Sequence, residues 1–419
     1  MEQKRGIIQA LTRVQLLLIA LIMLLGLILR VVMILHHPDR PITIYDDMYY
    51  IKSAQRLLEA GIFTFGFDVN LPTVFIPPVF PLYLAGVFAV FGSGEVGLTV
   101  AQYSFAVIGT LAIGMTALLG AVIKRPYAGI VGALIYAVYP PTILSSIVFL
   151  TESMFTLGML AFFVVLIRAI QTHRTSLFIW AGVLLGITTL TRPTIALVPA
   201  VVGLYLWFRA DYGFKKAFRV GVLLVATLFL VLSPWIIRNY VDFHQFIPLT
   251  KASGNPFLTG TYLNHDVWSG GHDPQFKDLP VGWKRVPGDQ IATNDLLMEM
   301  GKQRLQAEFS KHPKEMLQWY TIGKFRAFWS RPFDWRETLV GDFQVLIPIH
   351  KYLVVFGALG MFVSVLRKQE FVWLLVLFFA YFTGVHMVYV TLPRYALPLL
   401  PILFLFVGML LPERNRVVE

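Results

Sequence analysis

Residues 14–35 read VQLLLIALIMLLGLILRVVMIL. A membrane-spanning helix needs about 20 mainly apolar residues, and this stretch meets that length. It does not read as a cleavable signal peptide, because the apolar run is too long and no small-residue cleavage site precedes the polar stretch 36–40. Further apolar runs follow at 98–122, 127–148, 153–167, 177–190, 194–208, 220–237, 347–366, 371–390 and 395–411. The sequence therefore predicts an all-α, polytopic membrane protein with about 10 transmembrane segments.

The composition agrees with this fold class. Of the 419 residues, 57% are hydrophobic and 14% are charged, whereas an ordinary soluble chain is about 25% charged. This balance excludes a disordered or disulfide-stapled class and argues against a soluble multi-domain enzyme. The absence of cysteine excludes disulfides, thiol catalysis and cysteine-ligated zinc.

The net charge of +11 reads as a topology signal rather than as the sign of a nucleic-acid partner. Cytoplasmic loops of membrane proteins carry an excess of Lys and Arg. Six segments hold 15 of the 35 Lys and Arg residues and 5 of the 24 Asp and Glu residues: 1–13, 123–126, 167–176, 209–219, 367–370 and 412–419. Placing all six inside gives one consistent path through the plasma (inner) membrane, with both termini cytoplasmic.

Two long loops then lie on the extracytoplasmic side. The chain divides into an N-terminal transmembrane module with its first outer loop at 36–97, a second outer loop, and a C-terminal transmembrane module, at 1–237, 238–346 and 347–419. Apolar spacing predicts juxtamembrane surface helices in the two loops at 47–60, 79–91, 289–309 and 313–329. Pro193 interrupts the apolar residues between 177 and 208, which predicts a short helical hairpin whose turn faces outward.

Two acidic sites face the predicted outer side. Asp46 and Asp47 directly follow the first span, and adjacent carboxylates at a membrane surface are costly unless they are solvated or used. One of them could act as a general base on an acceptor hydroxyl; the alternative is solvated loop charge or an N-cap on the helix that follows. Glu152 lies among hydrophobic residues at the outer end of 127–148, where it is either functional or a helix-start charge favoured by the helix dipole.

Three arginines, Arg192, Arg238 and Arg394, also fall on the outer side, against the positive-inside trend. Arginine binds phosphate oxygens through a bidentate fork. The alternative for any one of them is a side chain that extends to the membrane interface. Three arginines on the same side as Asp46 and Glu152 together favour an anionic ligand.

Two weaker patterns are discounted. The G-x-G-x-x-G match at 92–97 has no buried strand before it, so a dinucleotide-binding interpretation fails. His36-His37, and His265 with His272, lack the spacing of a metal site.

In combination these residues resemble the GT-C glycosyltransferases, specifically the bacterial relatives of protein O-mannosyltransferases and of the lipid A aminoarabinose transferase. The resemblance runs over nearly the whole chain and rests on the order and spacing of short motifs. They are Asp46-Asp47 with Tyr50, Ala54, Leu58 and Gly61; Pro77-Pro78; Thr151-Glu152; Leu190-Thr191-Arg192-Pro193; Pro234-Trp235 with Arg238-Asn239-Tyr240; and Arg394-Tyr395 with Pro398 and Pro401.

The resemblance implies a multi-span enzyme whose active site lies at the extracytoplasmic membrane surface. It implies transfer of a sugar from a polyprenyl-phosphate (undecaprenyl-phosphate) carrier with inversion, with Asp46 as general base and Glu152 orienting the acceptor, the base or a metal. Many relatives have Asp-Glu where this chain has Asp46-Asp47. The Lys-Pro that contacts lipid phosphate in the aminoarabinose transferase appears here as Pro77-Pro78. The donor-phosphate role then falls to Arg192, Arg238, Arg394, Tyr50 and Tyr395.

Other readings stay open at this point. A transporter or flippase of an anionic lipid would use the same arginines, but it would place ionisable groups along a path through the bilayer, and the spans are almost charge-free. A non-catalytic scaffold would leave the outward acids unexplained. The sequence does not name the sugar (hexose or pentose) or the acceptor (glycolipid, cell-wall polymer or protein). It also leaves open whether a divalent cation such as Mg or Mn is used, with Asp46, Asp47 and Glu152 as candidate ligands.

Overall fold

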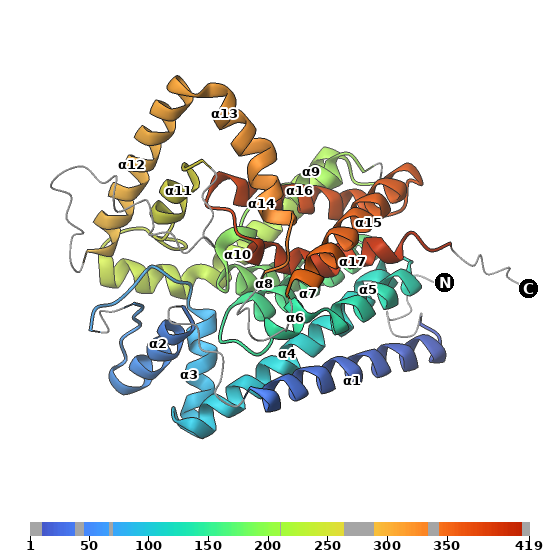
Figure 1. Cartoon of the computed structure of the whole chain (residues 1–419), viewed down its shortest axis with the longest axis horizontal. Helices are drawn as coiled ribbons and strands as arrows, with labels where there is room; N and C mark the ends of the chain where they lie inside the picture. Colours follow the sequence, from blue (N-terminus) through green and yellow to red (C-terminus); the bar gives the residue numbers. More distant parts are fainter. Residues whose placement is uncertain are drawn as a thin grey trace, which may run out of the picture.

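Every regular element in the described part of the chain is a helix (Figure 1). The structure is a computed structural model, and it describes residues 11–37, 46–66, 70–209, 211–263, 289–333 and 343–412. The predicted all-α class is confirmed. The predicted cytoplasmic positions of both chain ends fall outside the described residues.

Five helices are long and apolar enough to cross a membrane: α1 (Arg13–His36), α4 (Glu95–Val122), α7 (Glu152–Thr172), α10 (Gly213–Phe243) and α15 (Leu346–Leu366). Shorter apolar helices fill the remaining predicted spans: α5 (Pro126–Val138), α8 (Thr175–Thr189), η3 (Pro193–Ile195) with α9 (Val198–Trp207), α16 (Val372–Val388), and η7 (Pro393–Leu399) with α17 (Leu400–Gly408). An integral membrane protein follows from these helices, while the count of about 10 spans stays a prediction.

The predicted surface helices form where the apolar spacing placed them. The first outer loop contains α2 (Asp46–Ala60) and α3 (Val79–Phe91). The second contains α11 (Gly254–Gly260), α12 (Gln290–Lys311), α13 (Pro313–Gln318), the π-helical η5 (Trp319–Gly323) and α14 (Lys324–Trp329), and η6 (Phe343–Val345) precedes α15. In Figure 1, α2, α3, α11 and α12 gather at one end of the bundle, where α1 ends and α4 begins.

Three of the segments predicted to be cytoplasmic meet through ion pairs. The Glu370 carboxylate accepts from Lys124 Nζ at 2.7 Å and from Arg209 Nη2 at 3.1 Å. These residues come from the segments 367–370, 123–126 and 209–219. Their contact supports the prediction that the three basic segments share one side of the membrane.

Small residues allow the helices to approach closely. A Cβ added at Gly120 of α4 would lie 2.3 Å from the Cα of Gly129 in α5, so the two backbones touch at this point. Close backbone approach at small residues is the usual way that helices associate in membranes, where burial of apolar surface gives little driving force.

One predicted span is interrupted. The run 127–148 forms α5 and then breaks before α6 (Pro140–Leu144), because the proline ring removes the N–H that a continuing helix would need. Residues 145–151 form turns and bends rather than a helix, and all residues from 141 to 151 are buried. Irregular backbone at membrane depth is tolerated only where protein covers it. This buried segment leads directly into Glu152, the first residue of α7.

Candidate active site

Four charged side chains from distant parts of the sequence form one network. Arg394 Nε donates to Glu152 Oε1 at 2.5 Å, and Arg394 Nη1 donates to Asp46 Oδ2 at 3.0 Å. Arg192 Nη1 donates to the same Glu152 Oε1 at 2.9 Å. The structure thus brings together two predicted acids and two predicted arginines, with Arg394 between the two carboxylates.

The local structure explains why these four side chains meet. Asp46 and Glu152 are the first residues of α2 and α7, where the partial positive charge of a helix N-terminus favours a carboxylate. Arg192 directly precedes Pro193, the first residue of the short 3₁₀ helix η3, and Arg394 directly follows Pro393, the first residue of the 3₁₀ helix η7. Each arginine therefore lies where a proline begins a new short helix. The helix-start interpretation of both acids is therefore confirmed, and their predicted functional roles stay predictions.

Burial differs sharply between the two acids. The side chain of Glu152 is 1% exposed, whereas that of Asp46 is 46% exposed. Within the described part of the chain, Glu152 Oε2 is buried and has no hydrogen-bond partner. Glu152 is thus placed to hold the two arginines, and Asp46 is the acid that a molecule from solution can contact.

Aromatic rings line the same network. The guanidinium carbon of Arg192 lies 5.3 Å from the centre of the Tyr395 ring and 5.9 Å from that of Phe155, within the range of cation–π attraction. Tyr50, one turn after Asp46 on α2, is buried against Phe80. Burial, and next the negative charge of Asp46, raise the pKa of the Tyr50 phenol well above its ordinary value, so the group remains a neutral donor.

Asp47 differs from its neighbour. It is fully buried on α2, and its Oδ1 accepts from the backbone N–H of Met48 at 2.9 Å. Its predicted catalytic role stays a prediction.

Arg238 is used within the protein. Its Nη1 donates to Thr73 O at 2.6 Å, and its Nε pairs with Asp242 Oδ2 at 2.8 Å. A weaker bond of 3.4 Å runs from Nη2 to Phe63 O. These bonds fasten the end of α10 to the first outer loop, so the geometry gives Arg238 a structural task, and its predicted phosphate contact stays a prediction.

The acids do not assemble a metal centre in the described residues, where no group of three or more His, Cys, Asp or Glu side chains could hold an ion. Asp46, Asp47 and Glu152 therefore do not form such a group. The Arg394 guanidinium lies between Asp46 and Glu152, where a bridging cation would have to sit. Of the histidines considered above, His36 donates from Nδ1 to Val32 O at 2.9 Å within α1, and His265 and His272 fall outside the described residues.

Two buried polar residues near this region were not singled out from the sequence. His386 of α16 lies with its ring centre 5.2 Å from that of Tyr395, beneath the Arg192 contact. Arg30 of α1 is fully buried and bonds to the segment that precedes Glu152. Both are single ionisable residues inside apolar runs, and that pattern is the signal that would have found them.

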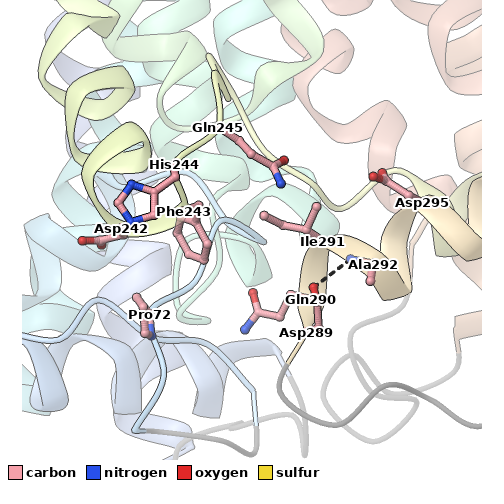
Figure 2. Close-up of a pocket in the computed structure, with 10 residues that line it drawn as sticks. All are labelled: Pro72, Asp242, Phe243, His244, Gln245, Asp289, Gln290, Ile291, Ala292 and Asp295. Atoms are coloured by element: carbon pink, nitrogen blue, oxygen red, sulfur yellow. Dashed lines mark hydrogen bonds between the residues drawn. The ribbon is translucent and has the colours of Figure 1, made fainter.

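The described residues also form a pocket of about 600 Å³ between the end of α10 and the start of α12, shown in Figure 2. Its three carboxylates already have partners. Asp242 pairs with Arg238, Asp295 pairs with Lys251, and Asp289 caps α12 by accepting from the Ala292 N–H at 2.8 Å. The pocket therefore shows no unpaired buried group that would assign it a ligand.

Comparison with known proteins finds a family that matches part of this chain. Residues 76–237, which include Glu152 and Arg192, match the sequence profile of the family described as dolichyl-phosphate-mannose-protein mannosyltransferase. Among curated protein sequences none matches this chain.

The solved structures that align with this chain share little sequence with it. The apo oligosaccharyltransferase of Archaeoglobus fulgidus aligns with a TM-score of 0.59 at 14% identity, over 94% of this chain and 50% of that one. The same archaeal enzyme, AglB, in complex with an inhibitory peptide and a dolichol-phosphate gives 0.57 at 15% identity, over 95% and 50%. ArnT from Cupriavidus metallidurans bound to undecaprenyl phosphate gives 0.45 at 14% identity, over 94% and 77%.

The chain therefore has the fold of the GT-C glycosyltransferases, as the resemblance predicted. It spans about half the length of the archaeal oligosaccharyltransferases that it matches.

Proposed function

We propose that this protein is a membrane glycosyltransferase that moves a sugar from a polyprenyl-phosphate donor to an acceptor hydroxyl at the extracytoplasmic membrane surface. The observation that carries the proposal is the network of Asp46, Glu152, Arg192 and Arg394, because it combines an accessible carboxylate with two guanidinium groups. A carboxylate can accept a proton while arginines stabilise negative charge that develops on a leaving phosphate.

In the proposed step, Asp46 takes the proton of the acceptor hydroxyl as that oxygen attacks the anomeric carbon of the sugar. The bond between the anomeric carbon and the phosphate oxygen breaks, and the polyprenyl phosphate leaves with the electron pair. Attack from the side opposite the leaving group inverts the anomeric centre. Asp46 suits the role of base because it is the more exposed of the two paired acids.

The donor phosphate would bind the outward edges of Arg192 and Arg394. Both guanidinium groups are held on their inner side by Glu152 Oε1, and this common partner fixes their spacing. Arginine offers five N–H donors, so bonds to Glu152 leave other donors for phosphate oxygens. Tyr395 lies against the Arg192 guanidinium, and Tyr50 follows Asp46 by one turn of α2. We infer that their hydroxyls add neutral hydrogen bonds to the donor.

The distribution of basic residues assigns the active site to the extracytoplasmic side of the membrane in this proposal. Nucleotide sugars are cytoplasmic, whereas the predicted topology places this network on the outer side, opposite the basic segments. A lipid-phosphate donor resolves that mismatch because the carrier presents the sugar at the outer surface. The contact of three basic segments through Glu370 supports this assignment.

We further propose that transfer needs no divalent cation at this site, because the guanidinium groups of Arg192 and Arg394 together already balance the charge of the two carboxylates. Transfer measured with and without EDTA tests this statement. Undiminished transfer in EDTA is expected, and loss that added Mg or Mn restores would overturn it.

To test the proposed activity, the purified full chain is reconstituted in proteoliposomes together with membranes that carry the acceptor. Radiolabelled undecaprenyl-phosphate hexoses and pentoses serve as donors, and the label that reaches the acceptor fraction is counted. Asp46→Asn is expected to lower transfer at least about a hundredfold, the usual scale of general-base catalysis. Asp211→Asn, in a segment predicted to be cytoplasmic, is the matched control.

Normal transfer by a folded Asp46→Asn variant would remove Asp46 as the base. Movement of labelled lipid across the vesicle membrane with no label in any acceptor would favour the flippase instead.

A further inference from the structure

Arg30 stands out within α1. Many side chains of this helix are exposed on the outside of the bundle, including Val14, Leu17, Leu21 and Leu24, yet Arg30 is fully buried. A charged side chain inside a membrane-spanning helix is costly and is retained where it has a task.

The partners of Arg30 are neutral. Its Nε donates to Ser146 Oγ at 3.0 Å, its Nη1 to Gly26 O at 3.0 Å, and its Nη2 to Thr142 O at 3.4 Å. Ser146 and Thr142 belong to the interrupted segment between α5 and α7. The guanidinium therefore joins the first helix to a stretch of chain more than a hundred residues away.

Two glycines make room for these bonds. A Cβ at Gly109 of α4 would lie 2.7 Å from Arg30 Nε and 2.2 Å from Ser146 Oγ. A Cβ at Gly26 would lie 3.3 Å from Arg30 Nη1. Glycine at both positions leaves the space in which the guanidinium and the serine hydroxyl meet.

The segment needs donors from elsewhere because it does not form a continuous helix. In a membrane interior, each carbonyl that lacks its helical partner must be satisfied by another group. Gln102 of α4 supplies a second donor, from its Nε2 to Ile147 O at 3.3 Å, and Ser153 Oγ donates to Ser145 O at 2.7 Å. Within the segment, Ser145 Oγ and Ser146 Oγ also donate to Thr142 O, each at 2.9 Å. Arg30 adds a donor from another helix to this carbonyl and to the Ser146 hydroxyl.

The segment ends at Glu152, six residues after Ser146, and Glu152 Oε1 holds both Arg192 and Arg394. A shift of the segment would move the acid and, with it, both arginines. We propose that Arg30 is a positioning residue of the transferase: it fixes the buried segment 142–151 and thereby sets the position of Glu152. This inference rests on the proposed function, because it assigns Arg30 to the same site.

The test compares Arg30→Met and Arg30→Lys with Arg13→Met, a matched control at the exposed start of the same helix. Displacement of a catalytic group by about 1 Å can lower a rate about a hundredfold. We expect Arg30→Met to lower kcat at least about tenfold, because moving Glu152 also moves the two arginines that stabilise the leaving phosphate. Arg30→Lys keeps the charge and some donors, so its kcat should fall between those of Arg30→Met and the parent.

A second readout does not depend on transfer. Hydrogen–deuterium exchange measured by mass spectrometry should show faster amide exchange at 142–151 in Arg30→Met, with no comparable change in α10. A kcat for Arg30→Met within about threefold of that of Arg13→Met would overturn the proposal. Unchanged exchange at 142–151 would overturn it as well.

If Arg30→Met is not recovered as a folded protein, Ser146→Ala decides the question, because it removes the hydroxyl that accepts from Arg30 Nε and donates to Thr142 O. A lower kcat is expected, and parental kcat would overturn the proposal. A parent chain that transfers no sugar would refute the proposed function itself. The exchange experiment would still decide whether Arg30 holds the segment.

Discussion

Replacing Glu152 by glutamine removes one negative charge from the centre of the active-site network while it keeps the size of the side chain. Arg192 and Arg394, which are 14% and 17% exposed, then lose their shared anionic partner. The amide oxygen of glutamine can still accept from them, but the compensating charge is gone. Two poorly solvated guanidinium groups would be left close together.

The expected loss of stability is large. Removing one partner of a buried ion pair costs about 3–5 kcal/mol. Because the amide oxygen keeps part of the hydrogen bonding, we expect the lower end, about 3 kcal/mol. That is a substantial fraction of the total stability of a typical folded protein, about 5–15 kcal/mol.

The assay is the apparent melting temperature of the purified chain in one detergent, followed by helical circular dichroism. Because the entropy of unfolding is about 2.1 cal/mol/K per residue, a loss of this size is expected to lower the apparent melting temperature of this 419-residue chain by about 3 °C. Glu370→Gln is the matched control, because Glu370 also bridges two cations, Lys124 and Arg209, but is 34% exposed. Exposed ion pairs contribute about 0–1 kcal/mol, so the control should shift little.

Equal melting temperatures for Glu152→Gln and Glu370→Gln would refute the reasoning that burial makes the first network costly to break. A double variant gives a second check. If Arg394→Gln is added to Glu152→Gln, the combined loss should be smaller than the sum of the two single losses, because the residues interact directly. Strict additivity would show that the contact contributes nothing.

Three further predictions test other parts of the structure. Gly109→Ala places a methyl group against Arg30 and should destabilise the chain by about 1–3 kcal/mol, whereas Gly221→Ala, which meets nothing within 4 Å, should not lower the melting temperature. Burial lowers the pKa of Lys324 to about 7 from an ordinary 10.5. Between pH 7 and pH 10.5 the unfolded chain therefore binds one more proton than the folded chain, and the free energy of unfolding should rise with pH across this range. A melting temperature that rises equally from pH 7 to 9 in Lys324→Gln would contradict this cause. Asp47→Ala should lower the stability by about 1–3 kcal/mol, because it removes the buried oxygen that accepts from the Met48 N–H, and a melting temperature equal to that of the parent would contradict this structural role.

Much of the fold follows from local sequence patterns. The apolar run at 14–35 predicts α1, and the spacing of 47–60 and 79–91 predicts α2 and α3, because hydropathy and helical periodicity are properties of neighbouring residues. Pro193 marks the break between α8 and α9 for an equally local reason, the missing N–H. The interruption of 127–148 was not predicted, since apolar residues continue through the buried turns of 145–151.

The candidate active site could be described only from the sequence and the tertiary structure together. The residue types and their predicted side of the membrane singled out Asp46, Glu152, Arg192 and Arg394, and the structure brings these four together. The same reasoning placed Arg238 beside them, but its guanidinium bonds to the first outer loop and to Asp242.

By itself, the sequence determined that this protein is helical and that its apolar helices belong in a membrane, and it predicted that the basic segments share one side. These properties depend on composition and on spacing along the chain. Only the tertiary structure decided that Arg394 lies between Asp46 and Glu152, and that Arg30 bonds to the segment leading to Glu152. Such contacts join residues far apart in sequence, and the packing of helices at small residues, rather than any local pattern, sets which side chains meet.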